Sequence, residues 1–537
     1  MPNSPRQELL DLQKRLYKHN ERLIESSIIV KESGFEAYED RYRKNVRNYQ
    51  QIVSHEEMIQ DILKSDIIYV GDYHTCNQSQ RSFLRILKNV VTKKKNITIG
   101  LELIHHNFQE AIDSYLNGKI TDSTFIAKTK LKEQWIFDLW SNFKPLFDFA
   151  KYHGLKIVGI DAAGEKASLL QRDKASAKVL VDVLKKNSQT ILFVFIGDLH
   201  IAPQHLPLEV NKLLKQMNLK KKELILYENS EPIYWKLAEN GLDDKTEVVR
   251  LAGGNYCRMH TPPIVCQQSY LNWLEHEEGE IDYYDAKSNF LDLVERIAKF
   301  LKIKLGPEID EIEVFTCGDI SFLKKLRESK KFNKQELNLI KQQILSSESY
   351  YIAKTKYVYL ANLSLNHAAE EAAHYLKSLC SGLEEPREYV DAFYANILHE
   401  TLGFFGSKLI NHKRKCFHEA EFKKLLEYLR TIDVPGERSL EKQTAELILE
   451  FKKYEKSGIP LLFTNIYRQP MELFLATTHA LGYMLGDRLY YAMVDHVVTK
   501  AAIKAMFFDP WLESGEPYET YMKLVKKLKG VKIPKRM

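Results

Sequence analysis

The sequence predicts an α/β fold, with a mostly parallel sheet flanked by helices and a largely α-helical C-terminal region. Short continuous apolar runs in the first half alternate with amphipathic stretches such as QRSFLRILKNVV. Runs of this length and composition are typical of strands buried on both faces, and their alternation with helices favours a parallel sheet. After about residue 363 the pattern is helical. The runs are DIIYVGD (66–72), NITIGLEL (96–103), KIVGID (156–161), TILFVFIGDLH (190–200) and ELILYEN (223–229).

The chain is long enough for several domains, at 537 residues and 62.7 kDa. Pro262-Pro263, in a loop rich in Cys, His and Pro, marks the best boundary between the two halves. Beyond it, a helix, a strand, two helices and a hairpin follow in the order of a winged-helix module. We therefore expect an N-terminal helical extension over 1–62, an α/β domain over 63–260, a winged-helix-like module over 285–362 and a helical bundle over 363–530.

Composition narrows the classes of partner and location. The formal net charge of +6 is small for this length, so no nucleic-acid partner is expected. The most apolar run, Ile191–Gly197, is far too short to span a bilayer, and the charged first residues contain no apolar signal core. The six cysteines include no C-x-x-C pair, which suits a reducing compartment. We expect a cytoplasmic protein without a membrane span and with a small-molecule ligand.

Two G-D-x-H motifs provide the main functional signal. One ends at His74 and the other at His200, and each directly follows an apolar run. In a parallel sheet, ligands bind beyond the carboxyl ends of the strands, and glycine allows a sharp turn there. We therefore expect Asp72, His74, Asp198 and His200 to project into one crevice.

Two further strands deliver carboxylates to the same edge, namely Glu102 and Asp161. Imidazoles and carboxylates gathered at one point suit a divalent metal ion, and they suit general acid/base work equally well. The structural alternative is that each histidine is a hydrogen-bonded residue of an ordinary turn. Of the adjacent His105 and His106, at most one can join the site, because neighbouring strand residues face opposite ways.

From about residue 64 to 230, the motifs and their order resemble those of the ChaN-like haem-binding proteins. Their broad superfamily also holds the Tiki proteases and the erythromycin esterases. The segments that carry the resemblance are YVGDYHT followed by Gln78 and Gln80, LELIHHNFQEAID, WSNFKPLFDFAKYHGLKIVGIDA, LLQRDKASAKVL and FVFIGDLHIAPQHLP.

The resemblance implies a haem- or iron-ligand-binding protein whose cofactor is haem or a divalent metal ion. It places the family's two motif histidines on His74 and His200 and its acidic strand-end residue on Glu102. Arg172 and Asp173 match the family's Arg-Asp pair in the helix after the third strand, where the arginine could hold an anionic group. Tyr73 stands where a haem-ligating tyrosine could lie, and Asp72 replaces the glutamate that is frequent in the family. The alternative is a metal-dependent hydrolase in which His74 or His200 acts as base with support from Glu102.

One helical segment in the C-terminal half, LNHAAEEAAHYL, gathers possible metal ligands. His367, Glu370, Glu371 and His374 fall on one face of the expected helix. Glu371-x-x-His374 matches half of a di-iron motif, but no second E-x-x-H falls on another expected helix. A polar face on an alanine-rich helix is the simpler interpretation. His399, Glu400 and His479 could also supply metal ligands, but their spacing in the sequence does not indicate a site.

Overall fold

The computed structural model describes residues 5–27, 34–94, 96–135, 139–164, 167–274, 281, 283–345, 348–384, 386–431, 436–457 and 465–533. The chain divides into two compact units. The first comprises Met1–Leu10 and Ile28–Tyr270, and the second comprises Asp11–Ser27 and Leu271–Met537. Helix α1 (Pro5–Ser27) therefore contributes residues to both units.

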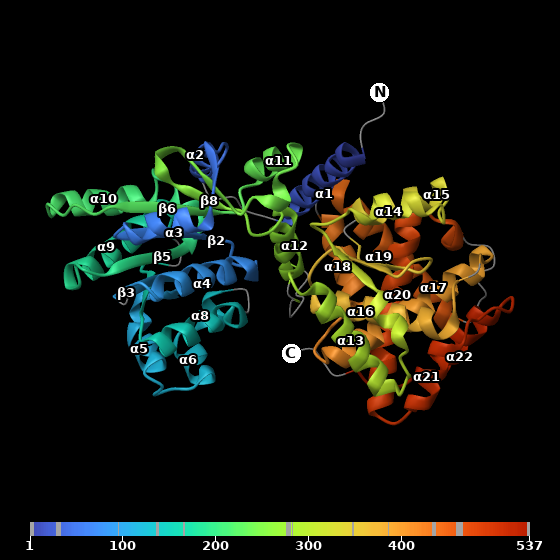
Figure 1. Ribbon diagram of the computed structural model, residues 1–537. Helices are drawn as coiled ribbons and strands as arrows, with labels where there is room; N and C mark the ends of the chain where they lie inside the picture. The colour runs from blue at the N-terminus through green and yellow to red at the C-terminus, as the bar shows by residue number, and fades with distance from the viewer. Residues whose placement is uncertain are drawn as a thin grey trace. The chain divides into compact units, whose positions relative to one another are not determined.

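In the first unit, the described residues form one eight-stranded sheet in the order β1-β7-β8-β6-β2-β5-β3-β4 (Figure 1). The neighbours from β8 to β4 pair in parallel, and β7 pairs antiparallel with both β1 and β8. The predicted mostly parallel sheet is thus confirmed. The strands are β1 (Gln51–Val53), β2 (Ile67–Asp72), β3 (Ile97–His105), β4 (Lys156–Asp161), β5 (Ile191–Gly197), β6 (Glu223–Glu228), β7 (Val248–Arg250) and β8 (Tyr256–Arg258).

Helices cover both faces of this sheet because its strand side chains alternate between two cores. Ile68 and Val70 of β2 pack in the core under α3, α4, α5, α6 and α8. Ile67 and Tyr69 pack in the opposite core under α9, α10 and α11. The helices are α2 (Phe35–Asn45), α3 (His55–Leu63), α4 (Asn77–Val91), α5 (Gln109–Leu116), α6 (Asp122–Lys128), α7 (Leu131–Gln134), α8 (Trp140–His153), α9 (Leu169–Lys186), α10 (Leu206–Gln216), α11 (Glu231–Glu239) and α12 (Pro263–Leu274).

Strand β8 lies just before Pro262-Pro263, in the segment expected to be a loop. Its three residues are too few for a period-two pattern, so the strand escapes sequence reasoning. Arg258 at its end is buried and donates hydrogen bonds to Ser82 and Glu247. Tertiary pairing with β6 and β7 therefore forms this strand where local sequence does not indicate one.

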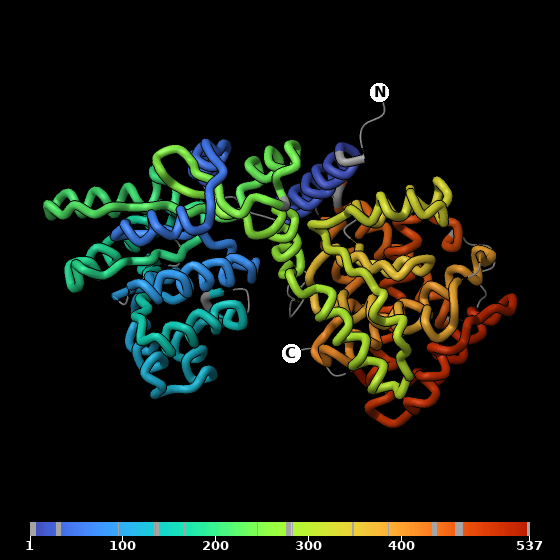
Figure 2. The backbone as a smooth tube through the Cα atoms, in the orientation of Figure 1, coloured from blue at the N-terminus to red at the C-terminus, as the bar shows by residue number. Residues whose placement is uncertain are grey.

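The second unit combines a three-stranded sheet, in the order β10-β11-β9, with a group of helices (Figure 2). The elements expected between residues 288 and 361 form in the expected order, and β9 pairs in parallel with β11. Helix α17 packs against both α16 and α20. The elements are α13 (Ala286–Leu301), β9 (Glu313–Thr316), α14 (Phe322–Ser329), α15 (Lys334–Leu345), β10 (Tyr350–Ile352), β11 (Tyr357–Leu360), α16 (Leu365–Ser381), α17 (Tyr389–Ile410), α18 (Glu419–Thr431), α19 (Ser439–Ser457), α20 (Met471–Val494), α21 (Lys500–Phe508) and α22 (Glu516–Leu528).

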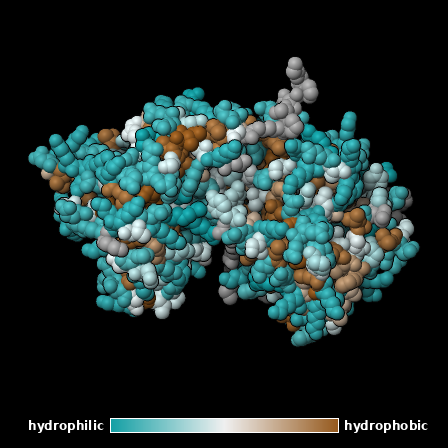
Figure 3. Space-filling view, viewed as in Figure 1, coloured by the Kyte–Doolittle hydropathy of each residue, from teal (hydrophilic) through white to brown (hydrophobic). Residues whose placement is uncertain are grey.

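The surface drawn in Figure 3 is mostly hydrophilic, with scattered hydrophobic side chains. Among the described helices, none combines the length and the apolar character that a bilayer crossing requires.

Candidate functional site

The two G-D-x-H motifs lie side by side because their strands are neighbours. Strand β2 pairs in parallel with β5, and Asp72 lies opposite Gly197 in the register. Strand β3, on the other side of β5, carries Glu102. The Glu102 carboxylate lies between the two histidines, with Oε2 3.6 Å from His74 Nε2 and Oε1 3.9 Å from His200 Nε2. The structure thus brings His74, Glu102 and His200 together.

The orientation of the His74 ring is fixed by its neighbours. Its Nδ1 lies 2.8 Å from Asp72 Oδ2, and Gln80 Nε2 donates to Asp72 Oδ1 at 2.6 Å. Trp135 makes an edge contact with the His74 ring, with the ring centroids 4.9 Å apart. A carboxylate on Nδ1 fixes the imidazole tautomer and directs Nε2 toward Glu102.

His200 is held in the same way by a second aspartate. Its Nδ1 lies 2.7 Å from Asp173 Oδ1, while the Tyr38 hydroxyl donates to Asp173 Oδ2 at 2.8 Å. The Tyr38 ring stacks on His205, with the centroids 3.5 Å apart. Tyr38 comes from α2, in the segment predicted as an N-terminal extension, and no motif in the sequence distinguishes it. Sequence reasoning therefore missed this residue.

The charges of the site reinforce one another. Burial favours a neutral His74, but the Asp72 hydrogen bond and the charges of Asp72 and Glu102 prevail and raise the pKa of His74 to about 9. Burial likewise opposes protonation of His200, and Asp173 with Glu102 raises the pKa of His200 above its usual range. For Glu102, the two histidines and the Gly197 N–H outweigh burial and lower the carboxyl pKa. At neutral pH the Glu102 anion and the protonated His74 therefore stabilise each other, and Glu102 also favours the protonated form of His200.

The raised pKa of His74 predicts that the stability of the protein depends on pH. The pKa of His74 is higher in the folded state, so its contribution is complete below about pH 6.5 and is lost as the pH rises through about 9. We expect the unfolding free energy of the wild type to fall by roughly 1–3 kcal/mol over this window relative to His74→Gln. Urea unfolding of both proteins from pH 6 to pH 10 measures the difference, and parallel curves would contradict the prediction.

Asp198, expected in the same crevice, makes different contacts. Tyr42 donates to its Oδ2, and within the described residues Oδ1 is buried without a hydrogen-bond partner. A Cβ at Gly71 would lie 1.7 Å from Asp198 Oδ1, so the carboxylate fills the space beside that glycine. Burial, followed by the charge of Glu228, raises the pKa of Asp198 well above its usual range. Asp198 thus contacts Tyr42 and Gly71 instead of Glu102.

The motif glycines provide space rather than a special backbone conformation. Neither Gly71 nor Gly197 has a positive φ angle, which corrects the expected role in a sharp turn. A Cβ at Gly197 would lie 3.3 Å from His74 Nε2 and 3.4 Å from Glu102 Oε2. The absent side chain therefore allows the imidazole and the carboxylate to approach the strand end.

The remaining predicted residues surround the cluster or lie outside it. Arg172 Nη1 lies 3.8 Å from Asp161 Oδ2, and its positive charge acts on both His74 and Glu102. Tyr73 is 37% exposed. Two more histidines interact with backbone groups: His106 Nδ1 lies 2.9 Å from the Gly159 carbonyl oxygen, and His105 Nδ1 accepts from the Asn107 N–H.

Comparison with known proteins finds a family model that matches part of this unit. No curated protein matches the sequence. One similar solved structure is "Cofacial heme binding to ChaN of Campylobacter jejuni", with 16% identity, a TM-score of 0.27, and coverage of 34% of this chain and 88% of that chain. A sequence model of the family "Haem-binding uptake, Tiki superfamily, ChaN" matches residues 58–178. This match confirms the resemblance drawn from the sequence, and it includes His74 and Glu102 but ends before His200. Residues 58–178 of this chain are therefore a match to the ChaN family of the Tiki superfamily.

Proposed function

We propose that this chain binds haem at the polar site formed by His74, Glu102 and His200. One observation carries the proposal: the Asp72 carboxylate holds Nδ1 of His74 and leaves Nε2 directed into the site, within a segment that matches a haem-binding family. Imidazole is a common ligand of haem iron, and iron binding at His74 Nε2 would displace the proton from that nitrogen. A carboxylate on the opposite ring nitrogen raises the basicity of such a ligand. The chemistry of the residues present therefore fits a haem group.

Other residues of the site suit the remaining parts of a haem. The Arg172 side chain is 32% exposed and could form charge-assisted hydrogen bonds with a propionate. Tyr73, adjacent to His74 in the chain, offers a phenol, which is another known type of haem ligand. The His74 side chain is 25% exposed, so it is partly accessible from solvent.

Hemin titration of the full chain tests this proposal. We expect a Soret band on addition of hemin, with a dissociation constant raised at least about tenfold in His74→Ala, because an axial ligand is lost. A Tyr73→Phe variant distinguishes a phenolate ligand from the imidazole. His153→Ala is the matched control, since His153 lies at the end of α8 against Phe149 and Tyr152. Unchanged hemin affinity in both site variants would contradict the proposal.

A metal-dependent hydrolase is the second candidate, and one arrangement favours it. Each histidine has its Nδ1 tied to an aspartate and its Nε2 near Glu102, a pattern that surrounds many protein-bound metal ions. Two results together would favour this candidate. Hemin would produce no Soret band, and the purified protein would retain zinc or manganese. Turnover of ester or peptide libraries would then depend on both His74 and His200.

A further inference from the structure

Three possible metal ligands from three helices meet in the second unit, and His374 lies beside one of them, Glu400. Helix α16 contributes Glu370 and His374, α17 contributes Glu400, and α20 contributes His479. His479 Nδ1 lies 3.3 Å from Glu400 Oε2, and His479 Nε2 lies 3.8 Å from Glu370 Oε1. His374 Nε2 lies 3.9 Å from the same Glu400 oxygen. Ligands about 2.0–2.2 Å from one ion lie roughly 3–3.5 Å apart, so modest side-chain movement would complete the shell.

Glycines allow the helices to approach closely enough for these residues to meet. A Cβ at Gly403 of α17 would lie 2.1 Å from His374 Nε2. A Cβ at Gly482 of α20 would lie 2.3 Å from Glu400 Cβ and 2.8 Å from the Ile397 carbonyl oxygen. The missing side chains leave the space that the His374 ring and Glu400 occupy.

Several ligand atoms in this cluster lack hydrogen bonds although they are buried. Within the described residues, Glu370 Oε1, His374 Nε2 and Glu400 Oε2 have no hydrogen-bond partner. Glu370 is only 3% exposed, and its other oxygen is held by Arg414 at 2.9 Å and by the Tyr483 hydroxyl. These bonds orient the carboxylate and leave Oε1 directed toward His479. Three such atoms gathered around one point, all of metal-ligand type, are what an ion bound there would account for.

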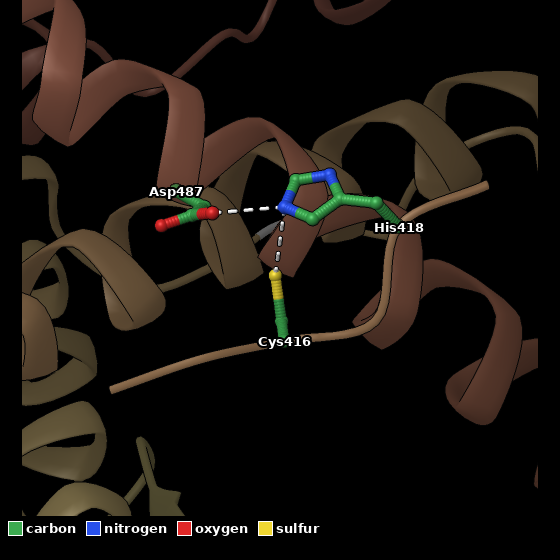
Figure 4. Close-up of side chains that lie close together, drawn as sticks. All are labelled: Cys416, His418 and Asp487. Atoms are coloured by element: carbon green, nitrogen blue, oxygen red, sulfur yellow. Dashed lines mark hydrogen bonds and ion pairs between the residues drawn. The ribbon is translucent and has the colours of Figure 1, made fainter. Parts of the chain in front are cut away.

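A second group of ligand-type residues provides a contrast. Cys416, His418 and Asp487 also lie close together (Figure 4). Both oxygens of Asp487 have partners there, because one accepts from Lys408 and the other lies 2.8 Å from His418 Nε2. Neither oxygen of Asp487 is therefore left for a metal ion. This second group is therefore a buried ion pair, whereas Glu370 Oε1 remains available.

We propose that Glu370, His374, Glu400 and His479 bind a divalent first-row transition ion, Fe²⁺ or Mn²⁺. Two carboxylates and two imidazoles are a ligand set that suits these ions. The half-motif found in the sequence is Glu371-x-x-His374, but Glu370 supplies the carboxylate near His479. The polar face on α16 is thus partly buried. The His479 side chain is 45% exposed and provides a route for the ion from solvent.

The charge state of the cluster agrees with this assignment. Burial lowers the pKa of His374 to about 4, so its imidazole is neutral at pH 7, as a metal ligand must be. Burial and the charges of Glu370, Glu371 and Glu348 raise the pKa of Glu400 well above its usual range. For Glu370, by contrast, Arg414 and the neighbouring histidines outweigh burial and lower the carboxyl pKa to about 2. A divalent cation bound at Glu400 would favour its ionised form and release its proton.

Mn²⁺ binding to the metal-stripped full chain tests the inference, with electron paramagnetic resonance detecting free Mn²⁺ and elemental analysis measuring bound Mn²⁺. We expect about one equivalent bound by the wild type and at least about a tenfold loss of affinity in Glu400→Gln and in His479→Ala. Mn²⁺ should also raise the melting temperature of the wild type but not of these variants. Circular dichroism without metal establishes that each variant folds.

Two control variants test whether Mn²⁺ binding depends on histidines outside this cluster. His399 is next to Glu400 in the chain, but its Nε2 lies 2.7 Å from Glu384 Oε1. The His399→Gln variant should therefore bind Mn²⁺ like the wild type. His74→Ala should also retain binding, which separates this proposal from the haem proposal. Less than about 0.1 equivalent in the wild type, retention in both Glu400→Gln and His479→Ala, or loss confined to His74→Ala would each overturn the inference.

Discussion

Replacing Asp173 with alanine should lower the free energy of unfolding of the first unit by about 3–5 kcal/mol. Asp173 is fully buried and accepts from the Tyr38 hydroxyl while it faces His200 Nδ1. Its removal leaves the buried His200 imidazole without the carboxylate that most strongly favours its protonated form. Urea unfolding followed by hydrogen exchange of the β5 amides would report on this unit separately.

Asp173→Asn is the matched control for this prediction. The amide oxygen still accepts a hydrogen bond from His200, so shape and one interaction remain while the negative charge is lost. We expect a smaller loss of about 1–3 kcal/mol, the cost of weakening a charge-assisted hydrogen bond. A change below about 0.5 kcal/mol in the alanine variant would show that Asp173 does not support the site.

Replacing Asp487 with alanine should destabilise the second unit by a similar amount, about 3–5 kcal/mol. Asp487 and Lys408 form a buried pair in which each side chain is at most 3% exposed. Without the carboxylate, the Lys408 ammonium retains the Arg414 carbonyl at 3.1 Å and the face of the Tyr491 ring. These contacts do not replace a full negative charge. Thermal unfolding monitored by helical circular dichroism gives the difference.

A double variant distinguishes the cost of an unpaired charge from simple loss of packing. Lys408→Met combined with Asp487→Leu removes both charges and keeps apolar volume, so we expect stability within about 1–2 kcal/mol of the wild type. If the double variant is as unstable as Asp487→Ala, packing rather than the buried charge is responsible.

Most of the α/β architecture could be predicted from local sequence. The apolar runs that become β2, β3, β4, β5 and β6 are long enough to show a pattern, and both faces of the sheet are covered as expected. Strand β8 was missed because three residues carry no detectable period. Its pairing with β6 and β7 depends on residues far away in the chain.

The candidate site was predictable only in part. His74, Glu102 and His200 follow from the motifs and from the rule that ligands bind at strand carboxyl ends. The different environment of Asp198 did not follow, since its contacts come from Tyr42 and the space beside Gly71. Tyr38 has no motif, and its role depends on how α2 packs.

The amino-acid sequence by itself determined the fold class and which strand ends carry histidines and carboxylates, because periodicity and short motifs act over a few residues. Tertiary structure alone decided which of these groups share a site. Glu370, Glu400 and His479 lie on three different helices and meet only when those helices pack at their glycines. Contacts between distant residues depend on helix packing and burial, and no local pattern records them.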